Sequence, residues 1–145
     1  MRSVALLDQA DAELRIALDQ IREVAHGIDP AALSEEGLAT GIEDLVEGSQ
    51  AIVTVDAVPR ERLDRRVEIA AFLIAREATR LPAGHRARIH IRRSGRMLHA
   101  SVEHDGDVPE IRDLEDRIGA LDGTIRVTTS DDGRVQIEAE IPCAS

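Results

Sequence analysis

The chain has 145 residues, of which 43% are hydrophobic, enough for the core of one ordinary domain. Eighteen basic against 28 acidic residues give a formal net charge of -10, and Phe72 is the only aromatic residue. Such a charge repels phosphate backbones, and without aromatic rings single-stranded bases have nothing to stack on. We therefore expect no nucleic-acid partner.

The N-terminal residues fit neither a secretion signal nor a membrane span, because Asp8, Asp11 and Glu13 interrupt the apolar positions. Cys143 is the only cysteine, so no intrachain disulfide can form and a reducing compartment is expected. We expect a cytoplasmic chain that makes no membrane contact of its own.

Residues 1–29 are predicted to form one long helix, which Gly27 and Pro30 end. Its apolar or small residues recur at alternating steps of three and four, the pattern of a heptad seam. So narrow a stripe needs a partner, either the chain's own domain or a dimeric four-helix bundle, and we favour the bundle. The seam consists of Val4, Leu7, Leu14, Leu18, Ile21, Ala25 and Ile28.

Residues 30–145 are predicted to form a second domain. A short helix opens at Ser34, a strand covers residues 52–55 before Pro59, and a second long helix covers residues 60–81 until Pro82 stops it.

The period of the apolar residues then changes to two. It predicts two strands joined at Ser94-Gly95, a short helix over residues 111–121, and a hairpin about Asp132-Gly133. Helices and antiparallel strands in this order indicate an α+β fold, a two-layer α/β sandwich.

Several segments resemble one family. "LRIALDQIREVAHGIDPAALSEEGLATGIEDL" (residues 14–45) is similar to the second bundle helix and linker of sensor histidine kinases of the nitrate-sensor-like class. "VEIAAFLIAREA", "LEDRIGALDGTIRV" and "VQIEAEIP" resemble that family's Asn-motif helix, its Gly-Leu-x-Asp-Arg stretch and its last strand. The similarity runs from about Ala12 to Pro142.

This resemblance implies a dimerisation bundle followed by an ATP-binding sandwich of the gyrase and histidine-kinase type. Family members bind ATP with magnesium, phosphorylate a bundle histidine and pass the phosphoryl group to a response regulator. That acceptor histidine lies on the first bundle helix, upstream of the residues matched here, and His26 matches a linker histidine instead.

The chain departs from the family at the positions that hold nucleotide. Glu77 and His85 keep two positions of the Asn motif, but Leu81 replaces the Asn that holds metal and phosphates, and leucine offers no oxygen ligand. His104 stands where an Asp accepts from the adenine amino group, while Gly106 is kept. Losing the Asp and the Asn removes about 3 to 6 kcal/mol, or roughly two to four decades of affinity.

Further changes surround that site. Val108 replaces the second glycine of the adenine motif, and only nine residues separate Gly106 from Asp116, fewer than relatives use for the lid over the phosphates. Asp113 replaces a glycine, and Arg134-Val135 stands where the family has Gly-Thr. The acidic residues of this stretch fit no compact calcium loop and indicate a solvated loop.

Two interpretations stay open. We favour a degenerate histidine-kinase-like domain that needs no cofactor and acts as a regulatory module, pairing as a homodimer or heterodimer through the N-terminal helix and docking a response regulator or a partner kinase. The alternative is a working ATP-binding domain of a truncated kinase, in which Glu77, Asp105 and Gly106 hold ATP with magnesium. Neither interpretation assigns a catalytic residue or a metal ligand in this chain. An anti-sigma-type regulator is disfavoured by the long heptad helix.

Overall fold

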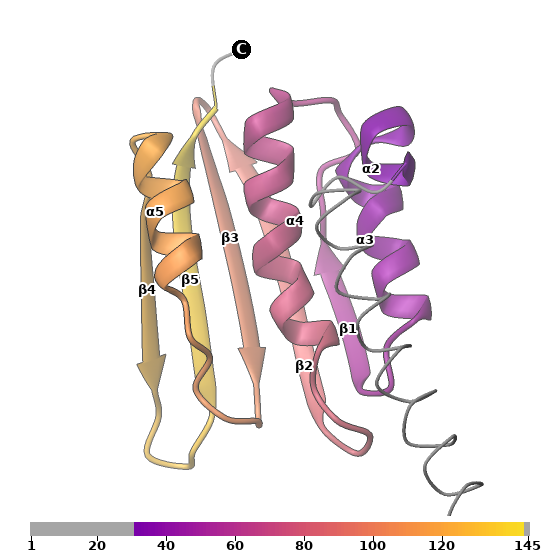
Figure 1. The fold of residues 1–145 in the computed structure, drawn as a ribbon, viewed down its shortest axis with the longest axis vertical. Coiled ribbons are helices and arrows are strands. Elements are labelled where there is room, and N and C mark those ends of the chain that lie inside the picture. Colours follow the sequence, from indigo (N-terminus) through magenta and orange to yellow (C-terminus); the bar gives the residue numbers. More distant parts are fainter. Residues whose placement is uncertain (1–30, 144–145) are drawn as a thin grey trace, which may run out of the picture. The chain divides into compact units, whose positions relative to one another are not determined.

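The structure, a computed structural model, describes residues 31–143 (Figure 1). The long helix predicted over residues 1–29 lies outside these residues. The elements are α2 (Ala31–Glu36), α3 (Leu38–Glu47), β1 (Ile52–Ala57), α4 (Arg65–Thr79), β2 (Arg86–Ser94), β3 (Met97–His104), α5 (Arg112–Ala120), β4 (Thr124–Thr129) and β5 (Val135–Pro142). Within the described part of the chain, no helix is long and apolar enough to cross a membrane.

One five-stranded sheet carries the fold, in the order β1-β2-β3-β5-β4. Strand β1 runs parallel to β2, and the other neighbouring pairs are antiparallel. The helices lie on one face of this sheet, with α4 across its middle (Figure 1). This arrangement confirms the predicted α+β fold, a two-layer α/β sandwich.

The core lies between the sheet and α4. Alternate residues of β2, β3 and β5 are buried, and the register aligns Ile89, Val102 and Ile137 across the three strands. Helix α4 covers them with a face that includes Ala70, Ala71, Ile74 and Ala78, all fully buried. Small alanines let the helix lie close to the strands, so a dense interior forms with a single aromatic ring.

The other face of the sheet is not covered by any of the described helices (Figure 1). The alternation that buries one side of each strand turns charged and hydroxyl side chains outward on the other side, as in an antiparallel sheet with one solvated face. Neither edge strand, β1 or β4, contains a buried residue, and Ile52 of β1 is 56% exposed. The apolar pattern of β1 reflects strand propensity more than burial.

Two helix boundaries differ from the prediction. Ser34 lies inside α2 instead of opening a helix, and Gly37, at φ +96°, separates α2 from α3. Helix α4 begins at Arg65, five residues later than predicted, because the Asp64 side chain accepts a hydrogen bond from the Arg66 N–H (2.9 Å) and caps the helix. The hairpin turn predicted about Asp132-Gly133 is present, and the turn predicted at Ser94-Gly95 lies one residue later, at Gly95-Arg96.

An ion pair joins the start of α4 to the end of α2. The Glu68 carboxylate, 2% exposed, accepts from Arg62 Nη2 (3.1 Å), Arg62 Nε (3.3 Å) and the Leu63 N–H (3.3 Å). Arg62 also donates to the carbonyls of Ser34 (3.1 Å) and Glu35 (3.3 Å), near the end of α2. We call this group the Arg62–Glu68 clamp.

Candidate functional site

Two chain segments that carry predicted site residues meet at one end of the sheet. Leu81 follows the end of α4, and Gly106 follows the end of β3. A Cβ atom placed on Gly106 would lie 2.4 Å from Leu81 Cδ2. The leucine methyl group therefore lies directly against the glycine, and a side chain at position 106 would displace it.

His104, the last residue of β3, lies beside this contact with only 3% of its surface exposed. Its Nδ1 atom accepts a hydrogen bond from the Gly106 N–H (3.0 Å), so the ring proton belongs on Nε2. Burial lowers the pKa of His104, although the charge of Asp105 opposes this effect. The imidazole is therefore neutral at pH 7, and the backbone occupies its Nδ1 lone pair.

Asp105 links the end of β3 to the start of β2. Its Oδ1 atom accepts from the Arg86 N–H (3.0 Å) and lies 2.9 Å from His85 Nδ1. The hydrogen bond from the Arg86 backbone and then that from His85 lower the pKa of Asp105. The carboxylate is ionised at neutral pH and already engaged by two groups of its own chain.

The contact of His85 with Asp105 was not foreseen from the sequence, although a signal for it exists. The turn at Gly95-Arg96 pairs Ser94 with Met97, and that register carries down the hairpin to pair Ala87 with His104. Continuing by one step places residue 86 opposite residue 105. The two-residue loop alone predicts which residues meet at the far end of the hairpin.

Glu77 lies one helical turn before Leu81, in the last part of α4. Its side chain is 16% exposed, and Oε1 lies 3.6 Å from Arg80 Nη1. Burial raises the pKa of Glu77, and the charges of Arg80 and Arg76 oppose it. The structure thus gathers Asp105 and Gly106 with Leu81, His85 and His104, while the ion pair of Glu77 is made within its own helix segment.

The loop after Gly106 is short and solvated. Val108 is 60% exposed, and α5 begins at Arg112 with Asp113 and Glu115 in its first turn, where acidic side chains complement the helix dipole. Across residues 31–143, no three His, Cys, Asp or Glu side chains lie together in a way that could hold a metal ion.

The fold is that of histidine-kinase ATPase domains. The chain is similar to a histidine kinase from Burkholderia phymatum STM815 (15% identity, 99% of this chain and 85% of that one, TM-score 0.57). It is also similar to the catalytic domain of histidine kinase ThkA (14% identity, 72% of this chain and 93% of that one, TM-score 0.55).

A third similar structure is the blue-light activated histidine kinase of Erythrobacter litoralis EL346 (19% identity, 73% of this chain, TM-score 0.51). This chain spans 40% of the length of that kinase. No protein-family model and no curated protein matches the chain. At these identities the likeness defines the fold, and the activity has to be argued from the site.

Proposed function

We propose that this chain is a histidine-kinase-like domain of two-component signalling, of the nitrate-sensor-like class, whose ATP site has degenerated. It acts as a dimerising or partner-binding regulatory module and not as a kinase. The observation that carries this proposal is the Leu81 methyl group against Gly106, which puts hydrocarbon where the family pattern has a metal-holding amide.

The residues present do not fit ATP with magnesium. Magnesium takes hard oxygen ligands, and Leu81 supplies none. The adenine amino group is a hydrogen-bond donor and needs an acceptor. The Nδ1 atom of the buried His104 already accepts a hydrogen bond from the Gly106 N–H, so it is not available to adenine. Phosphoryl transfer depends mainly on metal positioning and charge neutralisation. The loss of these groups therefore abolishes catalysis, although the domain still folds.

The alternative, a working ATP-binding domain, relies on Asp105 as the adenine acceptor. The carboxylate is ionised, but Oδ1 is shared between His85 and the Arg86 N–H. Adenine would then depend on Oδ2 alone, at a side chain that is 46% exposed. This exposure favours the degenerate interpretation, because water competes for the same oxygen.

Calorimetric titration of ATP with magnesium into the chain tests the proposal. The expected result is no saturable heat up to about 1 mM ligand, an affinity limit near 4 kcal/mol. A dissociation constant below that limit, lost in Asp105→Asn and kept in Asp107→Asn, would overturn it. Asp107 is the matched control because it is an exposed acid in the same loop.

Dimerisation is tested separately, by sedimentation of the full chain. Leu18 belongs to the predicted heptad seam and Gln20 does not. We expect Leu18→Asp to yield monomers and Gln20→Asp to leave the dimer intact, since a charge in a seam is desolvated and one outside it is not. A wild-type monomer would remove the dimerising part of the proposal and leave the partner-binding part.

A further inference from the structure

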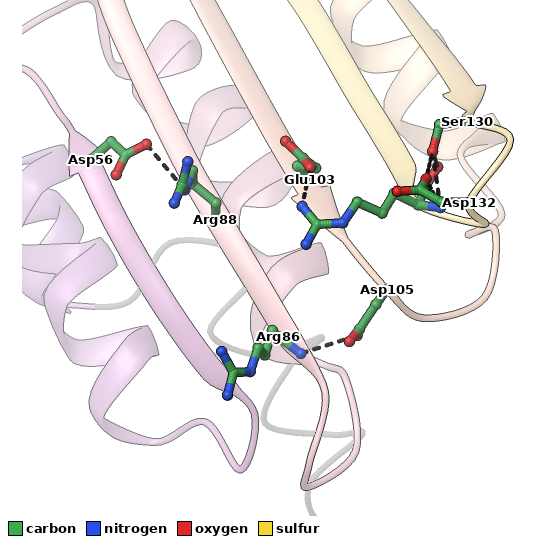
Figure 2. A network of polar contacts seen from close by, with 8 residues as sticks. Asp56, Arg86, Arg88, Glu103, Asp105, Ser130 and Asp132 are labelled. Atoms are coloured by element: carbon green, nitrogen blue, oxygen red, sulfur yellow. Dashed lines mark hydrogen bonds and ion pairs between the residues drawn. The ribbon is translucent and has the colours of Figure 1, made fainter.

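The open face of the sheet contains a hollow of about 170 Å³. Its lining includes Thr54 of β1, Arg86 and Arg88 of β2, Glu103 at the end of β3, and Arg134 just before β5. Figure 2 shows Arg86, Arg88 and Glu103 on this face. The hollow is therefore formed by the side of the sheet that the helices leave open, and Glu77 of α4 is not part of its lining.

Three arginines line this hollow, and two of them have carboxylate partners. Arg88 Nε lies 3.3 Å from Asp56 Oδ2, and Arg134 Nη1 donates to Glu103 Oε1. The Arg86 guanidinium makes no hydrogen bond or ion pair with any residue in the described range 31–143, although its backbone N–H donates to Asp105. At least one planar set of five donors is thus available to a ligand.

The two existing ion pairs do not close the hollow to an anion. The side chains of Arg88 and Arg134 are 62% and 59% exposed, and pairs this exposed contribute little to stability. Both guanidinium groups can therefore share their donors with a ligand at little cost. Thr54 adds a hydroxyl group at the β1 side of the hollow.

Basic residues outnumber acidic residues in the lining of the hollow, whereas the chain as a whole is acidic. Arg86, Arg88 and Arg134 face two carboxylates, Glu103 and Asp105, whereas the chain as a whole has 18 basic against 28 acidic residues. Each of those carboxylates already has a donor within the protein, Arg134 and His85 respectively. Forked guanidinium groups match the oxygens of phosphate, and no Phe, Tyr or Trp lines the hollow.

We propose that Arg86, Arg88 and Arg134 form a binding site for a phosphate group on the open face of the sheet. His104 and Asp105 also line the hollow, but the three arginines are not residues of the candidate nucleotide site, and neither Leu81 nor Gly106 is part of the lining. The phosphate site therefore does not depend on the proposed loss of ATP binding.

The test is an amide chemical-shift titration of the full chain with inorganic phosphate, at constant ionic strength in a phosphate-free buffer. Saturable shifts are expected at the start of β2 and the end of β3. Arg86→Gln should weaken binding about tenfold, the loss expected for one charged hydrogen-bonding group. Arg92→Gln should leave it within about twofold, since Arg92 points outward from the same strand but lies outside the hollow.

A variant that gains affinity sharpens the test. Glu103→Gln removes a negative charge from the lining and releases Arg134, so phosphate should bind several-fold more tightly. Shifts that do not saturate, equal weakening by Arg86→Gln and Arg92→Gln, or no gain in Glu103→Gln would each overturn the proposal. O-phosphoserine then distinguishes the sources: affinity equal to that of inorganic phosphate indicates an esterified group, and much weaker binding indicates the free ion.

Discussion

Helix α4 carries one carboxylate near each end, and the two differ in burial and in hydrogen bonding. At the first turn, Glu68 is 2% exposed and receives three hydrogen bonds from Arg62 and Leu63. Near the last turn, Glu77 is 16% exposed and its ion pair with Arg80 is long, at 3.6 Å. The two carboxylates lie nine residues apart on the same helix, and one is fully paired while the other is half-buried beside a long ion pair.

This difference distinguishes a carboxylate whose desolvation is compensated by hydrogen bonds from one whose compensation is weaker. A buried charge persists only when partners compensate its desolvation, and the clamp provides them at Glu68. At the other end, Leu81 and His104 fill the neighbourhood with hydrocarbon and a neutral ring. The contacts at that end of the helix are therefore made by an apolar side chain and a neutral one.

The largest effect is expected at the clamp, from Arg62→Ala. Among the described residues, the substitution leaves the buried Glu68 carboxylate with the Leu63 N–H as its only donor, and removing one partner of a buried pair costs about 3–5 kcal/mol. Denaturant unfolding measures the loss. Arg60→Ala is the control, because Arg60 pairs with Glu43 on the surface, where side chains are 77% and 54% exposed. Equal losses in the two variants would show that the clamp is not a stabilising feature.

The second largest effect is expected at Gly37, whose backbone lies against the Arg62 side chain of the clamp. Gly37 has φ +96° and ψ -175°, a region open essentially to glycine alone, and a Cβ there would lie 2.9 Å from Arg62 Cδ. Gly37→Ala should destabilise the fold by about 1–3 kcal/mol. Gly84→Ala is the comparison, since Gly84 also has positive φ (+91°) but no atom within 4 Å of its Cβ position. A smaller loss at Gly37 than at Gly84 would contradict the close contact with Arg62.

Much of this arrangement follows from the sequence, because it depends on periodicity. The alternation in residues 86–104 and 124–142 predicts the strands, and the glycines at positions 95 and 133 predict the turns between them. The clamp could not be predicted, since Arg62 and Glu68 stand among many charged residues and only the tertiary fold buries one of them. Likewise, nothing in the sequence distinguishes Arg86, whose side chain has no acidic partner among residues 31–143, from Arg88, which pairs with Asp56.

The candidate site was predictable in part. The replacements at Leu81 and His104 are visible in the sequence, but that the leucine contacts Gly106 depends on how the end of α4 packs against the end of β3. The prediction that Glu77, Asp105 and Gly106 hold a nucleotide in the alternative interpretation stays a prediction. The structure adds that Asp105 and Gly106 are engaged by neighbours of their own chain.

A smaller effect is expected when pH is lowered through the titration range of His104, in the candidate site. The folded state holds His104 neutral with a lowered pKa, so its contribution to stability is complete above the ordinary histidine pKa and is lost as pH falls below about 6.5. The slope from this group is at most about 1.4 kcal/mol per pH unit. The charges near the ring are Asp105, Asp107 and His85.

Unfolding measured between about pH 7 and pH 5 tests this slope, above the range where most carboxylates titrate. His104→Asn should flatten it, because an amide oxygen can accept from the Gly106 N–H without titrating. An unchanged slope in His104→Asn would assign the pH dependence to other groups.

The smallest effect, and the one with the opposite sign, is expected at Glu77. Burial raises its pKa, so the folded state favours the protonated carboxyl group, and the ionised form opposes folding at neutral pH. Glu77→Gln should therefore stabilise the chain at pH 7 by up to about 1 kcal/mol. The gain should vanish as pH falls below about 4.5, where the wild-type residue is protonated in both folded and unfolded states.

Glu43→Gln, at an exposed position, is the control and should change stability by a few tenths of a kcal/mol at most. A loss at pH 7 in Glu77→Gln would mean that the charged carboxylate makes a favourable contact, and Glu77 would then resemble Glu68 instead of contrasting with it.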